Sequence, residues 1–266
     1  MATARIGGLT INYALDGPEG APAVTFGHAQ ILDLRSWEPQ VAAFQDRCRV
    51  LRLDFRGHGG SALSEAAHGI EDLAGDVVGL LDALAIERTH YVGSSLGGMV
   101  GFALALAHPQ RLRSLSLVAT QGDLPTASAE RLRGLIAAAR AEGETMAPQA
   151  DAMLARYVAE GWSKTHPADY ARLREMAAET PVEGFARSSE AIIAMAFDHR
   201  LAEIRTPTLV IAGERDQPTP PERMRLYQDE IDGAEMTVIE GAGHFPNFDQ
   251  PDRFNARLEE FLSAHP

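Results

Sequence analysis

The 266-residue chain has very little of two residue types on which common structural and chemical motifs depend. Cys48 is its only cysteine, which excludes an intrachain disulfide, a cysteine-rich zinc site and a redox pair. Lys164 is the only lysine among the 24 basic residues, and no glycine-rich stretch precedes it. The chain therefore lacks the phosphate-binding lysine of a P-loop, which excludes a nucleoside triphosphatase of that class.

Long hydrophobic runs and an excess of positive charge are also absent. No window approaches about 20 uninterrupted apolar residues, and residues 1–8 lack a basic segment followed by an apolar run. We therefore expect a cytoplasmic protein with no membrane partner. The 37 acidic and 24 basic residues give a formal net charge of −13, so the average surface should repel polyanions, and we expect no nucleic acid partner.

The composition that remains is that of a globular protein, with 45% hydrophobic and 23% charged residues. Short apolar, β-branched runs alternate with longer helical patterns, which is typical of βαβ units and a mostly parallel sheet. The expected strands span residues 9–14, 23–26, 49–53, 89–92, 114–119, 208–212 and 235–239, and the expected helices span 71–84, 98–107, 221–230 and 252–264. This order predicts an α/β fold with a doubly wound sheet.

The alternation stops in residues 122–200, where no strand pattern occurs and Ala, Arg, Glu, Leu and Met recur at helical spacing. We expect one core domain made of residues 1–121 and 201–266, with a helical lid inserted after the strand at about 114–119. A block inserted there would lie above the carboxyl ends of the strands, where open α/β sheets bind ligands. The alternative is a small companion domain that does not contact substrate.

The most specific motif is Gly93-Ser94-Ser95-Leu96-Gly97, which joins an expected strand directly to an expected helix. A serine on such a sharp turn has a strained backbone, and small residues two positions before and after it let the strand and helix approach each other. Ser95 has Gly93 and Gly97 in register, whereas Ser94 would place a valine at the first glycine position. We therefore predict that Ser95 is a catalytic nucleophile.

A serine nucleophile needs a base that is oriented by a carboxylate. Asp216 and His244 follow expected strands, 121 and 149 residues after Ser95, and the chain order Ser, Asp, His is that of α/β-hydrolases. Glu214 is the alternative acid. His28, which also follows a strand, is either structural or a rival base.

Several stretches resemble one superfamily, namely residues 33–40, 53–59, 93–99 and 243–248. Outside the lid the chain is similar to the α/β-hydrolase fold superfamily, whose sheet has eight strands, and within it to 3-oxoadipate enol-lactonases and related small carboxylic ester hydrolases. The resemblance implies an oxyanion hole formed by the backbone N–H groups of Leu96 and Gln30. The first loop departs from the usual His-Gly, since it has the sequence Gly27-His28-Ala29-Gln30.

Other residues of the expected site have two interpretations. The Gln30 side chain either faces substrate or is solvated, and the charges and glycines of residues 54–59 either bind a ligand or brace a turn. We place His28, Trp162 and Phe245 in the substrate pocket, although methionines and Trp162 in lid helices usually fill a core.

We predict a serine hydrolase that cleaves a small carboxylic ester or lactone through an acyl-enzyme, with no metal or organic cofactor. The alternatives are a carbon–carbon bond or thioester hydrolase of the same fold, and a non-catalytic ligand-binding receptor. A nicotinamide-dependent reductase is excluded because no Gly-x-Gly-x-x-Gly follows the first strands. The expected partner is a small-molecule substrate, and a homodimer is compatible with the sequence.

Overall fold

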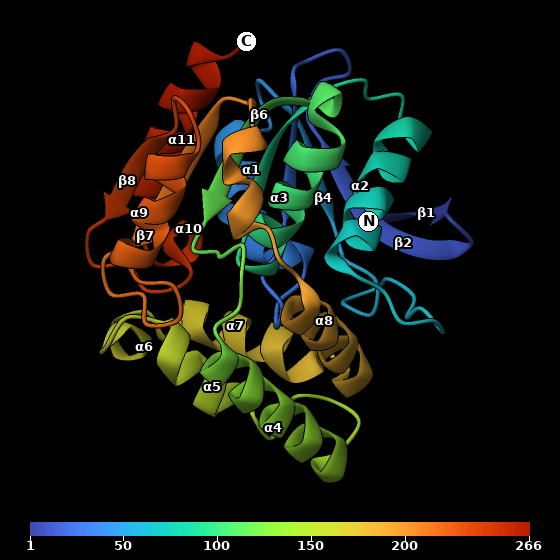
Figure 1. Cartoon of the computed structure of the whole chain (residues 1–266), viewed down its shortest axis with the longest axis vertical. Helices are drawn as coiled ribbons and strands as arrows, with labels where there is room; N and C mark the ends of the chain where they lie inside the picture. Colours follow the sequence, from blue (N-terminus) through green and yellow to red (C-terminus); the bar gives the residue numbers. More distant parts are fainter.

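A computed structural model describes residues 1–266, and an eight-stranded, mostly parallel sheet forms its centre (Figure 1). The strands are β1 (Ala2–Ile6), β2 (Leu9–Asp16), β3 (Ala23–Gly27), β4 (Arg49–Leu53), β5 (Thr89–Ser94), β6 (Leu112–Val118), β7 (Thr208–Gly213) and β8 (Glu235–Ile239). Their order is β1-β2-β4-β3-β5-β6-β7-β8, and only the pairs β1/β2 and β2/β4 are antiparallel. The carboxyl ends of β3 to β8 therefore lie at one edge of the sheet.

Helices cover both faces of this sheet, as expected for a doubly wound fold. They are α1 (Glu38–Phe44), α2 (Ile70–Ala83), α3 (Leu96–Ala107), α9 (Pro221–Glu230), α10 (Pro246–Asp249) and α11 (Pro251–Ala264), with short 3₁₀ helices at Leu34–Trp37, Pro109–Arg111 and Asp198–Glu203. Successive strand residues enter opposite cores because strand side chains alternate between faces. Tyr91 packs in the core shared with α2, α3 and α9, whereas Val92 packs in the core shared with α1 and α11.

Residues 122–200, which we call the helical segment, contain five helices and no strand of the sheet. The helices are α4 (Thr126–Glu142), α5 (Ala150–Tyr157), α6 (Trp162–Thr165), α7 (Pro167–Glu179) and α8 (Val182–Ala194). In Figure 1 they form a separate layer below the sheet. The two ends of the segment meet, because Asp123 Oδ1 accepts hydrogen bonds from the N–H groups of Phe197 (2.8 Å) and Asp198 (3.1 Å).

The helical segment shares a hydrophobic core with two loops of the rest of the chain, residues 1–121 and 201–266, which we call the sheet domain. This core contains Leu154, Leu173 and Phe185 of the segment together with Ile31, from the loop after β3, and Phe245, from the loop after β8. The segment is therefore packed onto loops that leave the carboxyl edge of the sheet. Its function as a lid stays a prediction.

The predicted fold class is confirmed. The structure also has strand β1 and helix α1, which were not predicted from the sequence. Strand β1 is an edge strand with mostly exposed or half-buried side chains, so its sequence ATARI lacks the apolar pattern of a buried strand.

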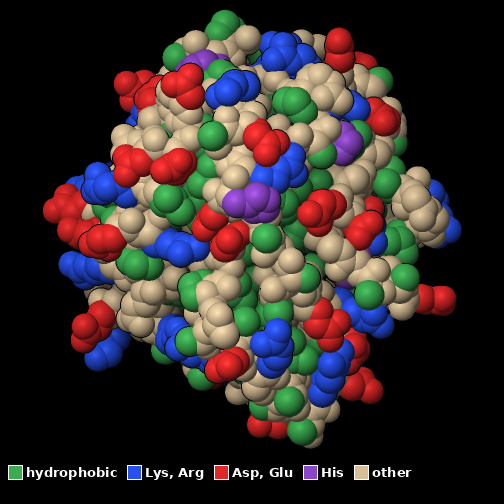
Figure 2. Space-filling view, viewed as in Figure 1, with side chains coloured by type: hydrophobic (Ala, Val, Ile, Leu, Met, Phe, Trp, Pro, Cys, Tyr) green, Lys and Arg blue, Asp and Glu red, His purple; other side chains and the backbone are tan.

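No helix has both the length and the apolar character needed to cross a membrane. Figure 2 shows acidic and basic side chains interspersed over one face, so the negative charge forms no continuous patch there.

Candidate active site

Ser95 lies at the sharp turn between β5 and α3. Its backbone has φ 50° and ψ −109°. Residues other than glycine rarely adopt this conformation, which costs about 1–3 kcal/mol. Two hydrogen bonds hold the turn: Ser95 N–H donates to the Val118 carbonyl (2.9 Å), and Thr120 Oγ1 donates to the Ser95 carbonyl (2.7 Å). The strain predicted from the motif is therefore present at Ser95.

The glycines around Ser95 are required by close backbone contacts. A Cβ atom at Gly93 would lie 2.1 Å from the Gly97 carbonyl oxygen, and a Cβ atom at Gly97 would lie 2.2 Å from the Gly27 carbonyl oxygen. These two contacts join the start of α3 to β5 and to the end of β3. They explain why small residues occur two positions before and after the serine.

Exposure distinguishes the two candidate serines. Ser94 is buried, and its hydroxyl has no hydrogen-bond partner, whereas Ser95 is half-buried. A nucleophile must be accessible to substrate, so the structure favours Ser95.

Asp216 and His244 form a buried, hydrogen-bonded pair at the same edge of the sheet. Asp216 lies in the loop after β7 and His244 in the loop after β8, and Asp216 Oδ2 is 2.8 Å from His244 Nδ1. Both residues are 4% exposed. The loops touch through their backbones, since a Cβ atom at Gly213 would lie 1.9 Å from the Gly243 carbonyl oxygen. Because β5, β7 and β8 are parallel, Ser95, Asp216 and His244 all leave the sheet at its carboxyl edge.

The rival acid and the rival base have other partners. Glu214 is exposed, and its Oε2 accepts a hydrogen bond from the Gly241 N–H (2.9 Å). His28 Nε2 accepts from the Phe55 N–H (2.9 Å), so the ring is neutral and Nδ1 donates to the Ala29 carbonyl (2.8 Å). Burial lowers the pKa of His28 to about 4. Neither ring nitrogen of His28 is free to act as a base, and its predicted place in the substrate pocket stays a prediction.

Two backbone N–H groups are available near the serine for an oxyanion. Leu96 is the first residue of α3, so its N–H has no acceptor within the helix. The Gln30 N–H, in the loop after β3, makes no backbone hydrogen bond. This loop is tied to the start of α3, because the Gly97 N–H donates to the His28 carbonyl (3.1 Å). The arrangement is compatible with the predicted oxyanion hole.

The Gln30 side chain is hydrogen-bonded to helix α8 of the helical segment. Its Nε2 lies 2.7 Å from Ser189 Oγ, 3.1 Å from Ser188 Oγ and 3.2 Å from the Phe185 carbonyl oxygen, all in α8. The helical segment therefore holds the loop that carries one of the two N–H groups. Neither of the two interpretations made from the sequence included this contact.

A second contact joins the helical segment to the histidine loop. The His244 N–H donates to the Tyr157 carbonyl (2.6 Å), and the Tyr157 ring lies against the His244 ring with centroids 5.0 Å apart. Phe245 packs beside the same imidazole at 5.5 Å. Trp162 stacks on His166 (5.1 Å) and belongs to the core of the helical segment. The pocket assignments of Phe245 and Trp162 stay predictions.

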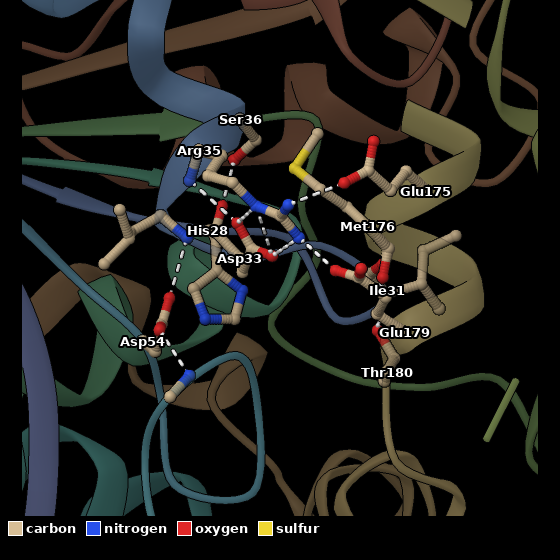
Figure 3. Close-up of polar contacts among 12 residues, drawn as sticks. His28, Ile31, Asp33, Arg35, Ser36, Asp54, Glu175, Met176, Glu179 and Thr180 are labelled. Carbon is tan, nitrogen blue, oxygen red and sulfur yellow. Dashed lines mark hydrogen bonds and ion pairs between the residues drawn. The ribbon is translucent and has the colours of Figure 1, made fainter. Parts of the chain in front are cut away.

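The loop at residues 54–59 braces its neighbours, which is one of the two interpretations made from the sequence. The Asp54 carboxylate accepts hydrogen bonds from Asn12 Nδ2 (2.7 Å) and from the N–H groups of Leu34 (2.8 Å) and Gly60 (2.8 Å). Figure 3 shows the Asp54 carboxylate with hydrogen bonds on two sides. The Arg56 guanidinium forms a two-bond pair with the Asp76 carboxylate, with both distances 2.7 Å.

Figure 3 also shows how Arg35, in the 3₁₀ helix that follows β3, reaches helix α7 of the helical segment. Its guanidinium pairs with Asp33 of its own loop (2.7 Å) and with Glu175 (3.2 Å) and Glu179 (2.6 Å) of α7. A cavity of about 320 Å³ lies beside this cluster, and none of Ser95, Asp216 and His244 lines it. The cavity is therefore not the place where these three residues would meet a substrate.

Two residues near the histidine were not predicted from the sequence. Thr219 Oγ1 donates to Asp216 Oδ2 (2.7 Å), and Asp249 Oδ2 accepts from the Gly243 N–H (2.6 Å). Burial raises the pKa of Asp249 from its ordinary 3.8 to about 7, although the Gly243 N–H opposes the rise. The only sequence signal for either residue was its position a few residues after Asp216 or His244.

A model of the α/β hydrolase fold family matches residues 22–251 of the chain. The chain therefore belongs to the α/β-hydrolase fold family and is an enzyme of the hydrolase class. 3-Oxoadipate enol-lactonase 1 of Acinetobacter baylyi is 30% identical over 257 residues, which are 97% of this chain and 94% of that relative. 3-Oxoadipate enol-lactonase 2 of the same organism is 32% identical over 254 residues, which are 96% and 93%.

Solved structures show the same relationship. The enol-lactonase of Burkholderia xenovorans LB400 is 34% identical with a TM-score of 0.94, and the match covers 98% of this chain and 100% of that one. A thermophilic esterase of Thermogutta terrifontis is 28% identical with a TM-score of 0.93, and the match covers both chains in full. The family resemblance seen in the sequence is thereby confirmed.

Proposed function

We propose that the chain is a serine hydrolase that cleaves a small carboxylic ester or lactone through an acyl-enzyme. The observation that carries the proposal is the position of a strained, half-buried Ser95 at the same sheet edge as the Asp216–His244 pair. The relatives with similar sequences, which are named enol-lactonases, support a lactone as the substrate.

In the first half of the reaction, Ser95 Oγ attacks the carbonyl carbon of the substrate, and its proton passes to His244 Nε2. Asp216 accepts the His244 Nδ1–H, which orients the ring and stabilises the imidazolium. The N–H groups of Leu96 and Gln30 bind the oxygen that becomes negative. When the tetrahedral intermediate collapses, the carbon–oxygen bond to the alcohol breaks and His244 returns the proton to the departing oxygen.

In the second half, water replaces the alcohol. His244 takes a proton from a water molecule, which attacks the acyl carbon, and the carboxylic acid leaves as the bond to Ser95 Oγ breaks and the proton returns to the serine. In a lactone the alcohol and the acyl group belong to one molecule, so a single hydroxy acid is released. Apart from the substrate and this water molecule, each step uses side chains and N–H groups of this chain.

We also propose that the helical segment acts as a lid over this site. The contacts of α8 with Gln30 and of Tyr157 with His244 support this assignment. The same contacts hold the loop that carries the Gln30 N–H and the loop that carries His244, so the lid would also position these two groups. A companion domain without access to the site would not need them.

The test is a panel of p-nitrophenyl short-chain esters, enol-lactones, thioesters and ring-fission diketones, assayed with the wild type and with Ser95→Ala. We expect multiple turnovers on an ester or lactone by the wild type and none by the variant, with unchanged circular dichroism. A preference for diketones or thioesters would favour the alternative hydrolases of this fold. Binding without turnover would favour a receptor, and full activity in Ser95→Ala would overturn the proposal.

A further inference from the structure

The Asp216 carboxylate accepts all of its side-chain hydrogen bonds from two residues. Its side chain is completely buried, and an ionised carboxylate in that environment is costly unless donors surround it. Oδ2 accepts from His244 Nδ1 (2.8 Å) and from Thr219 Oγ1 (2.7 Å), and Oδ1 accepts from the Thr219 N–H (3.1 Å). Every donor other than the histidine therefore belongs to Thr219.

Thr219 is itself fixed by its surroundings. It is 2% exposed and lies directly before Pro220 and Pro221, and Pro221 begins helix α9. The proline that follows Thr219 restricts the backbone of the threonine itself. Its β-branched side chain has few χ1 rotamers, so little conformational freedom is lost when the hydroxyl is placed.

We propose that Thr219 is a positioning residue, whose hydroxyl holds the Asp216 carboxylate in the orientation and charge state that align His244. The inference rests on the proposed function, because it assigns a purpose to the donor set only if Asp216 orients a catalytic base. Hydrogen bonds donated to a carboxylate stabilise its ionised form. The Thr219 hydroxyl therefore favours a state in which the shared proton stays on His244 Nδ1.

The geometry around Oδ2 explains why the hydroxyl acts on the histidine and not only on the loop. Thr219 Oγ1 is 3.4 Å from His244 Nδ1, so the hydroxyl, the carboxylate oxygen and the ring nitrogen form a compact triangle. Without the hydroxyl, Oδ2 keeps a single donor, and the orientation of the carboxylate depends on the histidine and on the longer bond from the Thr219 N–H to Oδ1 (3.1 Å). The imidazole would then lose alignment with Ser95 while the substrate contacts stay the same.

The matched substitutions are Thr219→Val, which replaces the hydroxyl by a methyl group of similar size, and Thr219→Ser, which keeps the hydroxyl. Thr208→Val is the control, because Thr208 is 1% exposed and its hydroxyl donates to the Thr206 carbonyl (2.8 Å). The readouts are kcat and KM on the best ester or lactone of the panel, the free energy of unfolding in urea, and the downfield proton NMR signal of the His244 Nδ1–H.

We expect Thr219→Val to lower kcat roughly 10- to 100-fold with KM within about twofold, since a hydrogen bond to a charged group is lost. Thr219→Ser should recover kcat to within about threefold of the wild type. Thr219→Val should shift the Nδ1–H signal, and Thr208→Val should leave both kcat and the signal unchanged. If Thr219→Val does not fold, Thr219→Ala takes its place with the same expectations.

Two results would overturn the inference while leaving the proposed function intact. One is full kcat in Thr219→Val when Ser95→Ala is inactive, and the other is equal loss of kcat in Thr219→Val and Thr219→Ser. Activity in Ser95→Ala would instead overturn the proposed function itself. The two failures are therefore distinguishable in one set of assays.

Discussion

The sheet domain and the helical segment hold the site in different ways. In the sheet domain, backbone touches backbone around the three predicted catalytic residues, as at Gly93 against Gly97 and at Gly213 against Gly243. The helical segment touches the histidine loop by backbone at one point, where a Cβ atom at Gly243 would lie 2.3 Å from the Tyr157 carbonyl oxygen, and otherwise contacts the site loops through side chains, as from Gln30 to Ser189. The sheet domain therefore sets the relative positions of the reacting groups, and the helical segment adjusts the loops around them.

This difference implies unequal sensitivity to substitution. A methyl group added where two backbone segments touch can be accommodated only if a strand or a helix moves, whereas an exposed ion pair can separate into solvent. Changes at the backbone contacts around the three predicted catalytic residues should therefore abolish activity or stability, and changes at the exposed ion pairs of the helical segment should have graded effects.

The largest expected effect belongs to the Asp216–His244 pair. Asp216→Asn should lower kcat by roughly 10⁴-fold, a loss known from the serine-protease triad, because the amide no longer selects the right imidazole tautomer. Glu214→Gln is the matched control, since Glu214 is exposed and should leave kcat nearly unchanged. Steady-state kinetics on the ester panel measure both. The reverse pattern would show that Glu214 is the acid.

Two glycine substitutions compare a close backbone contact of the sheet domain with an open position of the helical segment. Gly93→Ala places a methyl group 2.1 Å from the Gly97 carbonyl oxygen and should destabilise the fold by about 3 kcal/mol or more. Gly134→Ala, in α4, meets no atom within 4 Å and should stabilise by about 0.5–1 kcal/mol, because alanine favours a helix. Urea unfolding measures both. Equal effects at the two positions would contradict the requirement for a glycine at the Gly93 contact.

Asp249 makes the stability of the histidine loop depend on pH. Its pKa in the folded state is about 7, above its ordinary 3.8, so between these values the folded protein binds more protons than the unfolded chain. Its contribution to the free energy of unfolding is thus present below about pH 4 and falls by roughly 1.4 kcal/mol per pH unit until about pH 7.

Asp249→Asn removes this titration. The stability of the variant relative to the wild type should therefore increase from pH 5 to pH 7, as measured by urea unfolding at each pH. Asp252→Asn, at an exposed carboxylate in the first turn of α11, is the control and should show no such increase. A constant difference between Asp249→Asn and the wild type over this range would refute the assignment.

The smallest effect is expected at the ion pairs that connect Arg35 with α7. The Glu175 and Glu179 side chains are 59% and 58% exposed, so each pair should contribute about 1 kcal/mol or less. Arg35→Ala should speed amide hydrogen exchange in α7 a few-fold without changing exchange in the sheet. Arg200→Ala, which breaks a local pair with Glu203, should leave α7 unaffected. Faster exchange throughout the sheet would mean that the pairs support the whole fold.

Much of the sheet domain could be predicted from the sequence because its signals are local. The strand, turn and helix around Ser95 form one continuous stretch, residues 89–107, and its glycines lie at the close backbone contacts. Asp216 and His244 could be placed because residues after parallel strands meet at one edge. Strand β1 could not, since its side chains are largely exposed and the apolar alternation is missing.

The contacts of the helical segment could not be predicted, because they join residues far apart in the chain. Gln30 meets Ser189 across 159 residues, and nothing in the sequence around either residue indicates the other. Thr219 is only three residues from Asp216, but its role depends on the rotamer of a buried carboxylate. Local patterns therefore indicated the candidate catalytic residues, whereas the contacts of Gln30 and Thr219 depend on side-chain packing that those patterns do not show.

The central claim is that Ser95 is the nucleophile. A fluorophosphonate should add once per chain to the wild type, with peptide mass spectrometry placing the adduct on Ser95 and ester turnover falling in proportion to labelling. Ser95→Ala should gain no adduct. Labelling at another residue, or loss of turnover without an adduct on Ser95, would contradict the account.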